Sequence, residues 1–475
     1  MLFNSLEFFV FLPIIFIWYW LWQKQKLSFQ NGLLLVASYY FYACWDWRFL
    51  FLLMFSTGLD YFAGLMMHKA KSDGIRKFWF WLTISINIGF LGIFKYYNFF
   101  IDSFANLLQG YGFEAHRWTL SVILPVGISF YTFHGLSYVI DIYKRRIEPE
   151  HNFVEYALFV SYFPLLVAGP IERATHLLPQ IKKKRNFDYH VAIQGVKQII
   201  WGLFKKVVIA DNCAFFVNQI FDNANGYSAG ELWLGSVLFA FQIYGDFSGY
   251  SDIALGTSKL FGIDLLRNFN FPYFSKDIAD FWRRWHISLS TWFRDYLYIP
   301  LGGSRGSKWQ SVKNTFIIFL VSGFWHGANW TFIIWGLIHA LLFMPLLLSN
   351  SNRSSLKNEN YSYKDFPKII LTFIFVCLAW VFFRADSLTE ALAYIVGMFD
   401  LTSFDISLFY KNAKYTLISL ICFTSIAWLV FTEWQNVKKN NYEIQLSRGN
   451  LIILVLMIFF MGAFKNQMSF IYFQF

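Results

Sequence analysis

Long apolar runs recur along the whole of this chain and are separated only by short polar segments, and this repetition limits its fold more than any other feature. Such runs are long enough to cross a lipid bilayer as helices, and helices satisfy their own backbone hydrogen bonds in lipid. We therefore predict an all-α, polytopic membrane protein with about ten to twelve transmembrane helices. The candidate segments lie near residues 6–22, 31–45, 48–67, 78–100, 119–142, 153–170, 191–221, 231–262, 313–348, 367–384, 413–432 and 450–464.

Composition supports the same class of protein. The 475 residues are 57% hydrophobic and 22% aromatic, and only 15% are charged, whereas soluble domains carry roughly 25% charged residues. Because the apolar runs extend from end to end, we expect a single integral membrane domain, 1–475, surrounded by membrane lipids. The first apolar run has no basic residue before it, so we expect a first spanning helix and not a cleavable signal peptide.

The net charge of +11 fits a membrane protein better than a nucleic-acid-binding protein. Basic residues gather in short loops such as Lys24 to Lys26, 68–77 and 144–146, and no solvated basic domain is present to bind nucleic acid. Loops of this kind lie on the cytoplasmic side by the positive-inside rule, which predicts an N-terminus outside. The four cysteines have no paired spacing, so neither a disulfide framework nor a zinc site is indicated.

Some apolar segments are interrupted. Pro125 and Pro170 lie in 119–142 and 153–170, which we expect to bend or re-enter the membrane. Segment 191–221 carries several charges, among them Lys205, Lys206 and Asp211, so part of it should lie at the membrane interface. Residues 349–366 form a polar loop.

The region 264–310 is too charged to span a membrane and is predicted to be cytoplasmic or interfacial. At 100° per residue, residues 282–296 form an amphipathic helix that ends at Pro300 and Gly302. One face is aromatic and the other is cationic and polar. The aromatic face holds Trp282, Trp285, Leu289, Trp292 and Tyr296, and the polar face holds Arg283, His286, Ser290 and Arg294.

Residues 322–345 place His326 inside an apolar stretch long enough to cross a bilayer. An ionisable group there is costly and is a candidate functional residue. A neutral imidazole could take a proton from a hydroxyl, with Trp325 nearby and Asn329 donating to an acyl oxygen. The alternative is a structural histidine bonded to a neighbouring helix. Gly323 and Gly327 would permit close helix packing.

Other polar residues in apolar segments favour structural roles. His339 lies roughly 220° around a continuous helix from His326 and should face away from it. We expect His134 to pack or hydrogen bond within the membrane. Asp246 and Asp252 either bond neighbouring hydroxyls and arginines or line a polar passage, and we favour the first.

Two blocks resemble the membrane-bound O-acyltransferase (MBOAT) superfamily: FWRRWHISLSTWFRDYLYIPLGGSRG and, some forty residues later, FWHGANWTFIIWG. The branch typified by the alginate O-acetyltransferase membrane subunit also shares the blocks LPVGISFYTFHGLSYVIDIY, LVAGPIER and YGDFSGYSDIALG, which extends the resemblance over about residues 1–345. The final residues, FIYFQF, resemble a C-terminal signature of the same branch.

The resemblance implies a ring of tilted helices around a thinned centre and acyl transfer across the membrane to a hydroxyl. It assigns the essential histidine to His326 and the second shared histidine to His286. Arg283, Ser290 and Arg294, on the polar face, would meet an anionic acyl thioester, with acetyl-CoA expected as the donor. Tyr472 either accepts the acyl group transiently or belongs to a tail that plugs a groove.

We expect no permanently bound cofactor and no metal. The resemblance also implies the bacterial inner membrane and a periplasmic acetyltransferase or acyl-acceptor protein as partner, for O-acetylation of an exported polysaccharide or peptidoglycan. Two other classes of protein remain open from the sequence: a transporter or flippase of a lipid-linked sugar or acyl carrier, and a non-catalytic assembly scaffold.

Overall fold

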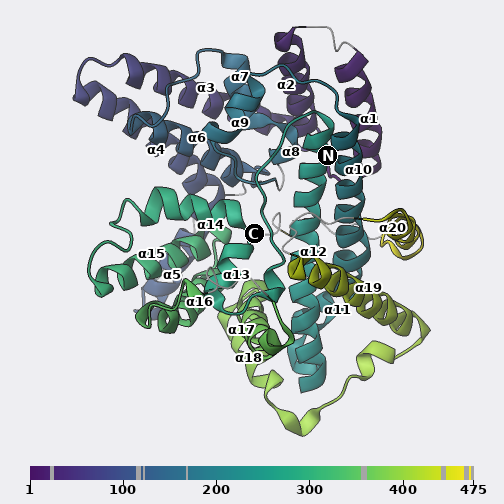
Figure 1. The fold of residues 1–475 in the computed structure, drawn as a ribbon. Helices are drawn as coiled ribbons and strands as arrows, with labels where there is room; N and C mark the ends of the chain where they lie inside the picture. The colour runs from purple at the N-terminus through teal and green to yellow at the C-terminus, as the bar shows by residue number, and fades with distance from the viewer. Residues whose placement is uncertain are drawn as a thin grey trace. The chain divides into compact units, whose positions relative to one another are not determined.

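The computed structural model describes residues 1–21, 26–113, 119–120, 123–166, 169–354, 361–439, 446–464 and 470–471. Helices account for the regular structure of these ranges, which contain no β-strand (Figure 1). The all-α prediction is therefore confirmed. Lys24 and Tyr472, on which two of the sequence predictions depend, lie outside the described residues, as do positions 355–360 of the polar loop.

The chain divides into two compact units, residues 1–196 with 254–266 and residues 197–253 with 267–475. The helices α10 and α12 contribute residues to both units. The helices up to α10 are α1 (Leu6–Leu21), α2 (Leu27–Ala43), α3 (Trp47–Lys69), α4 (Asp73–Leu91), α5 (Tyr97–Gly110), α6 (Ile128–Tyr143), α7 (Phe153–Ser161), α8 (Phe163–Leu166), α9 (Ala174–Ile181) and α10 (Tyr189–Leu203). Those that follow are α11 (Asp211–Asp222), α12 (Ala229–Leu260), α13 (Ile278–Arg284), α14 (Ile287–Phe293), α15 (Lys308–His326), α16 (Trp330–Leu348), α17 (Phe366–Arg384), α18 (Leu388–Met398), α19 (Ala413–Lys438) and α20 (Arg448–Met461).

Five helical segments in the described ranges are long and apolar enough to cross a membrane. This number is smaller than the predicted ten to twelve for two reasons. Turns divide several of the apolar runs, so that four more apolar helices have only 10–17 residues, and long helices such as α12 carry charged residues. The five long segments are Trp47–Lys69, Asp73–Gly110, Trp330–Leu348, Tyr363–Arg384 and Ala413–Lys438.

The expected bends at 119–142 and 153–170 are confirmed. Helix α6 begins only at Ile128, after Gly127, which has a φ of 73° and lies so close to the carbonyl oxygen of Leu166 that a Cβ would stand 2.2 Å from it. Gly127 adopts this backbone conformation and tolerates this approach without strain because glycine has no Cβ. In the second segment, residues 153–166 are split into α7 and α8 at Tyr162.

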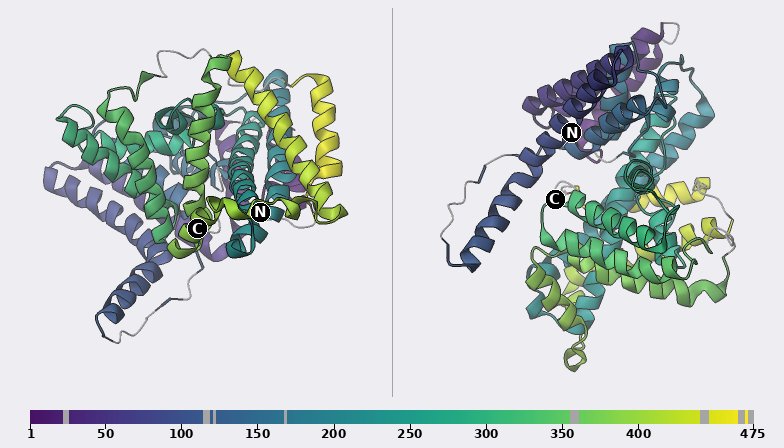
Figure 2. Two further views of the ribbon diagram at one scale, coloured as in Figure 1. Left: turned by 90° about the horizontal axis from the view of Figure 1, so that it is seen from below. Right: turned by 90° about the vertical axis from the view of Figure 1, so that its left-hand side faces the viewer.

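The predicted continuous span through 313–348 is wrong. Helix α15 ends at His326, the chain turns at 327–329, and α16 begins at Trp330. The two helices lie side by side (Figures 1 and 2) and cross closely at Gly323 and Gly336, where an added Cβ would stand 2.3 Å from a backbone oxygen of the other helix. Gly323 therefore serves the predicted close packing, whereas His326 lies at the end of a helix and not midway along a spanning one.

Segment 191–221 holds several of its charges inside the protein, which the expectation of an interfacial segment did not include. A π-helical turn, Phe204–Ala210, buries Lys205 and Lys206, with only 3% and 1% of the side chains exposed. Lys206 Nζ lies 2.8 Å from a carboxylate oxygen of both Asp211 and Asp246, and Lys205 Nζ lies 2.5 Å from Asp252. The favoured structural interpretation of the two aspartates fits these contacts, but their partners are lysines and not arginines.

Candidate active site

The predicted helix over 282–296 is interrupted at the histidine of the first shared block. Helix α13 ends at Arg284 and α14 begins at Ile287, and His286 between them has a φ of 43°. The turn is held by the amide of Ile287, which donates to the carbonyl of Asn268, and by the hydroxyl of Ser288, which donates to the Asn268 side chain. A left-handed backbone costs a non-glycine residue of order 1–3 kcal/mol and often marks a functional site.

This interruption corrects the expected surface position of His286. The side chain does not share an exposed cationic face with Arg283, Ser290 and Arg294; it is fully buried. Its ring contacts Phe247, with the ring centres 4.6 Å apart, and stacks on Trp325 at 6.1 Å. His286 lies outside the long apolar helices, and burial lowers its pKa to about 3, so the imidazole is neutral at pH 7.

The turn between α13 and α14 and the end of α15 bring the two candidate histidines together. The ring centres of His286 and His326 are 6.5 Å apart. Aromatic side chains surround His326: its ring centre lies 4.9 Å from that of Trp325, 5.1 Å from Trp335 and 5.4 Å from Phe383. Only 3% of His326 is exposed. The two imidazoles are therefore buried side by side among aromatic rings.

The other predicted binding residues have different surroundings. Asn329 is the N-cap of α16, since its Oδ1 accepts from the amide of Thr331, and its Nδ2 donates to the carbonyl of Asp386. Both polar atoms of the side chain thus have protein partners, and a contact with an acyl oxygen would require the Nδ2 bond to break. Arg283 donates from Nη1 to the carbonyl of Asn352 at 2.8 Å.

His339 and His134 each accept a hydrogen bond from another part of the protein. His339 does not face away from His326 along one helix, because the chain turns between them; the indole of Trp335 contacts both rings. His339 Nδ1 accepts from the indole N–H of Trp282 at 3.3 Å. His134 Nε2 accepts from the amide of Glu172 at 3.1 Å.

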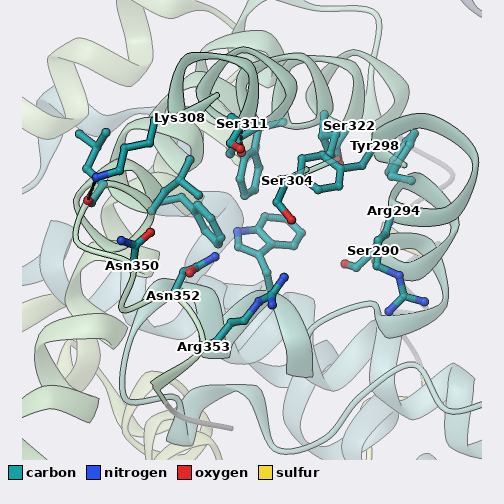
Figure 3. A pocket seen from close by; sticks show the side chains of 18 of the residues that line it. Ser290, Arg294, Tyr298, Ser304, Lys308, Ser311, Ser322, Asn350, Asn352 and Arg353 are labelled. Carbon is teal, nitrogen blue, oxygen red and sulfur yellow. Dashed lines mark hydrogen bonds between the residues drawn. The ribbon is translucent and has the colours of Figure 1, made fainter. Parts of the chain in front are cut away.

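A cavity of about 670 Å³ lies between α14, α15 and α16 and the segments beside them. Its wall includes two of the predicted residues, Ser290 and Arg294, and Figure 3 shows them across the opening from Lys308 and Asn350. The described lining carries three cations, Arg294, Lys308 and Arg353, and no carboxylate. Arg294 already pairs with Asp295, at 2.7 Å. The inner wall is apolar and includes Trp282, Leu289, Phe293, Ile318, Phe319 and Phe343.

The cavity follows one face of α15 toward His326. Lys308, Ser311, Thr315, Ile318 and Ser322 line it at helical spacing, over about 21 Å of helix axis. His326 is the next position on this face, about 6 Å beyond Ser322. Neither His326 nor His286 belongs to the lining, so the cavity ends one helical turn short of the histidine pair.

The described part of the C-terminal tail also reaches this region. The ring of Phe470 packs on Phe247 and Tyr250, at 6.0 and 4.6 Å, and Phe247 in turn contacts His286. The amide of Ile471 donates to Asp246 Oδ2 at 2.6 Å. The carboxylate bound to Lys206 thus holds the backbone one residue before Tyr472.

Sequence reasoning missed Ser322, Lys308 and Arg353 in the cavity wall and Asp246 as the partner of the tail. The small polar residues Ser311, Thr315 and Ser322 do repeat at helical spacing, which is a usable signal once a helix is known to end at His326. Arg353 and the tail contact depend on segments distant in sequence, and no local pattern marks them.

Residues 144–385, which contain both histidines and the cavity, match the model of MBOAT, the membrane-bound O-acyltransferase family. The chain is 40% identical over 443 residues to the peptidoglycan O-acetyltransferase of Helicobacter pylori, an alignment that covers 87% of this chain and 82% of that protein. It is also 40% identical over 413 residues to the Pseudomonas aeruginosa protein named "Probable alginate O-acetylase AlgI", covering 86% and 76%. A teichoic acid D-alanyltransferase of Bacillus subtilis is 29% identical over 289 residues, covering 57% and 71%.

The chain therefore belongs to the membrane-bound O-acyltransferase family. It is an acyltransferase enzyme with a helical membrane fold, as the two sequence blocks predicted. Its relatives act in O-acetylation and D-alanylation, as their names state.

Proposed function

We propose that this enzyme transfers an acyl group, in the first instance acetyl, from a cytoplasmic thioester to a hydroxyl, with His326 as the general base. The observation that carries the proposal is the alignment of the α15 cavity face with His326. The cationic cavity follows this face from Lys308 to Ser322, and His326, buried among aromatic rings, is the next position on it.

The cavity suits a donor with an anionic head and an apolar or thioester arm. Arg353, Lys308 and Arg294 would bind phosphate oxygens near the opening, since guanidinium groups match phosphate geometry with two parallel hydrogen bonds. Ser311, Thr315 and Ser322 offer hydroxyls along the arm. Acetyl-CoA has this chemistry, and it enters as a substrate and not as a bound cofactor.

The transfer step balances without any further reactant. His326 accepts the proton of the incoming hydroxyl, the hydroxyl oxygen bonds to the thioester carbon, and the carbon–sulfur bond breaks. The imidazolium then returns the proton to the departing thiolate, so that an ester and a free thiol result. A positioned base of this kind contributes roughly 10²–10⁴-fold, and alignment of the two reactants beside it contributes further.

The positive charges around the cavity favour the cytoplasmic side of the membrane as the side from which the donor enters. Arg294, Arg305, Lys308 and Arg353 lie at or beside the cavity lining, and clustered basic residues mark the cytoplasmic side. With the basic loops 68–77 and 144–146, this favours an enzyme of the bacterial inner membrane with its N-terminus outside. The acceptor would then be a periplasmic acetyltransferase or carrier protein, or the hydroxyl of an exported glycan such as peptidoglycan or alginate.

The test is the transfer of label. Purified full-length protein in lipid vesicles is supplied with acetyl-CoA that carries a radioactive acetyl group, together with a hydroxyl acceptor. We expect acid-stable ester label on the acceptor or on the chain. Movement of a lipid-linked sugar or acyl carrier across the vesicle without any covalent label would instead support the transporter class and overturn the proposal.

A further inference from the structure

We propose that Trp282 determines the length of the acyl group that this enzyme accepts, and that His339 is the residue that positions it. The proposal rests on the donor assignment above and goes beyond it by naming what limits the donor. It starts from a wall of packed side chains beside the path from the cavity to His326.

Two indoles form this wall. Trp282 lines the cavity, and its ring centre lies 5.6 Å from that of Trp335, which does not line the cavity. The ring of Trp335 lies in turn 5.1 Å from His326. In our proposal, an acyl group that enters along the α15 face meets Trp282 before it reaches the imidazole.

The Trp282 side chain is held from several directions. Its indole N–H donates to His339 Nδ1 at 3.3 Å, and its ring packs edge-on against Phe319 at 5.4 Å and His339 at 5.0 Å. His339 is fully buried in α16, and Trp335 supports its other side at 4.8 Å. A fixed wall of this kind sets a steric limit, because packed side chains do not yield gradually to an added methylene.

His339 has no part in the proposed chemistry, yet a polar imidazole is retained in an apolar helix. Its bond to Trp282 explains this: an aliphatic residue at the same place could pack there but would remove the acceptor that fixes the orientation of the indole N–H. The wall then admits the two-carbon acetyl group beside Ser322 and excludes longer chains.

Binding of unreactive thioethers tests the limit without relying on catalysis. S-ethyl-, S-butyl- and S-octyl-CoA are titrated into the full-length protein in detergent, and the dissociation constants are compared. We expect the wild type to bind S-octyl-CoA about ten-fold or more weakly than S-ethyl-CoA, a discrimination of the size that pocket walls give. Trp282→Ala should bring the ratio close to one.

Two milder variants guard against a folding defect in Trp282→Ala. Trp282→Phe shortens the wall, and His339→Leu removes the acceptor that orients it; both should give ratios between those of the wild type and Trp282→Ala. The matched control is Trp233→Ala, which removes an indole whose N–H donates to Met398 and which does not line the cavity. It should keep the wild-type ratio.

The outcomes separate the two proposals. Equal binding of all three thioethers by the wild type, or a ratio unchanged in the Trp282 and His339 variants, overturns the role of Trp282 and leaves the donor site standing. Failure of the wild type to bind any of the thioethers overturns the CoA donor site itself, and this inference with it.

Discussion

The two ends of α15 place opposite demands on the protein. At its N-terminal end, Lys308 joins Arg294 and Arg353 around an open cavity with hydroxyls in its wall. At its C-terminal end, His326 is enclosed by Trp325, Trp335 and Phe383. Anion binding requires cations that the ligand can reach, whereas a general base must be uncharged, and burial keeps an imidazole in that state.

The contrast shows that one helix can serve both demands, because the cation and the histidine lie several helical turns apart on the same helix. Lys308 and His326 share one face of α15, with about 27 Å of axis between them. Binding and chemistry should therefore respond differently to substitution at the two ends. The following predictions address that difference, from the largest expected effect to the smallest.

Substitution at the His326 end of α15 should abolish catalysis without unfolding the enzyme. We expect His326→Ala to lose roughly 10²–10⁴-fold in acyl transfer, the contribution of a positioned base, with unchanged binding of an S-ethyl-CoA analogue. Radiolabel transfer measures the activity, titration with S-ethyl-CoA measures the binding, and size-exclusion chromatography checks that the variant is folded. The exposed His190→Ala serves as control, and an active His326→Ala protein would remove the mechanism.

Substitution of a fully buried cation should affect stability far more than substitution of a cavity cation. Lys206 lies between Asp211 and Asp246, both 2.8 Å away. Lys206→Met leaves two buried carboxylates without their cation and should destabilise the protein by about 3–5 kcal/mol. Thermal unfolding in detergent measures it. The exposed pair Arg48–Asp46 provides the control, because solvent screens it and Arg48→Met should leave the unfolding temperature almost unchanged.

Substitution at the charged end of α15 should weaken binding of the donor and leave the rate of acyl transfer from the bound donor almost unchanged. We expect Arg353→Gln to raise the KM for the thioester several-fold with little change in kcat, because a lost phosphate contact affects the ground state and transition state alike. Arg294→Gln should have a smaller effect, since Asp295 already neutralises that guanidinium. A fall in kcat with unchanged KM in Arg353→Gln would place the residue at the reacting atoms instead.

The smallest expected effect is on the pH dependence of stability, and it comes from His176, which is half-exposed. Unlike the buried His286, whose pKa is lowered, His176 has a raised pKa. The hydrogen bond to Glu172, 2.8 Å away, raises the pKa of His176 above its ordinary value of 6.5. A raised folded-state pKa stabilises fully below 6.5, and the contribution disappears as the pH rises through the raised value. Thermal stability should therefore decline over that window, and His176→Gln should flatten the decline. An identical pH profile in the variant would contradict this contribution.

The helical class and both histidines could be read from the sequence, because apolar runs and the two shared blocks are local signals. The position of His326 could not. Gly327, Ala328 and Asn329 interrupt the apolar stretch 322–345 without a charge or a proline, so hydropathy alone suggested a continuous helix across the turn.

The break at His286 was missed for a related reason. Residues 282–296 fit an amphipathic helical pattern, but the pairing of Ile287 and Ser288 with Asn268 overrides the helical preference there. That partner lies about twenty residues away and carries no periodic signal. Long-range pairing likewise explains why Arg353 and the contact between Asp246 and Ile471 were not foreseen.

The most direct test of the central claim is to locate the acyl end of the bound donor. A CoA thioether with a photoreactive diazirine at its acyl terminus is bound to the wild-type enzyme, irradiated, and the labelled peptides are identified by mass spectrometry. The account predicts label between Ser322 and Trp335, which contains the end of α15 and the indole beside His326, and its loss on competition with acetyl-CoA. Competable label confined to segments that neither line the cavity nor contact the two histidines would contradict it.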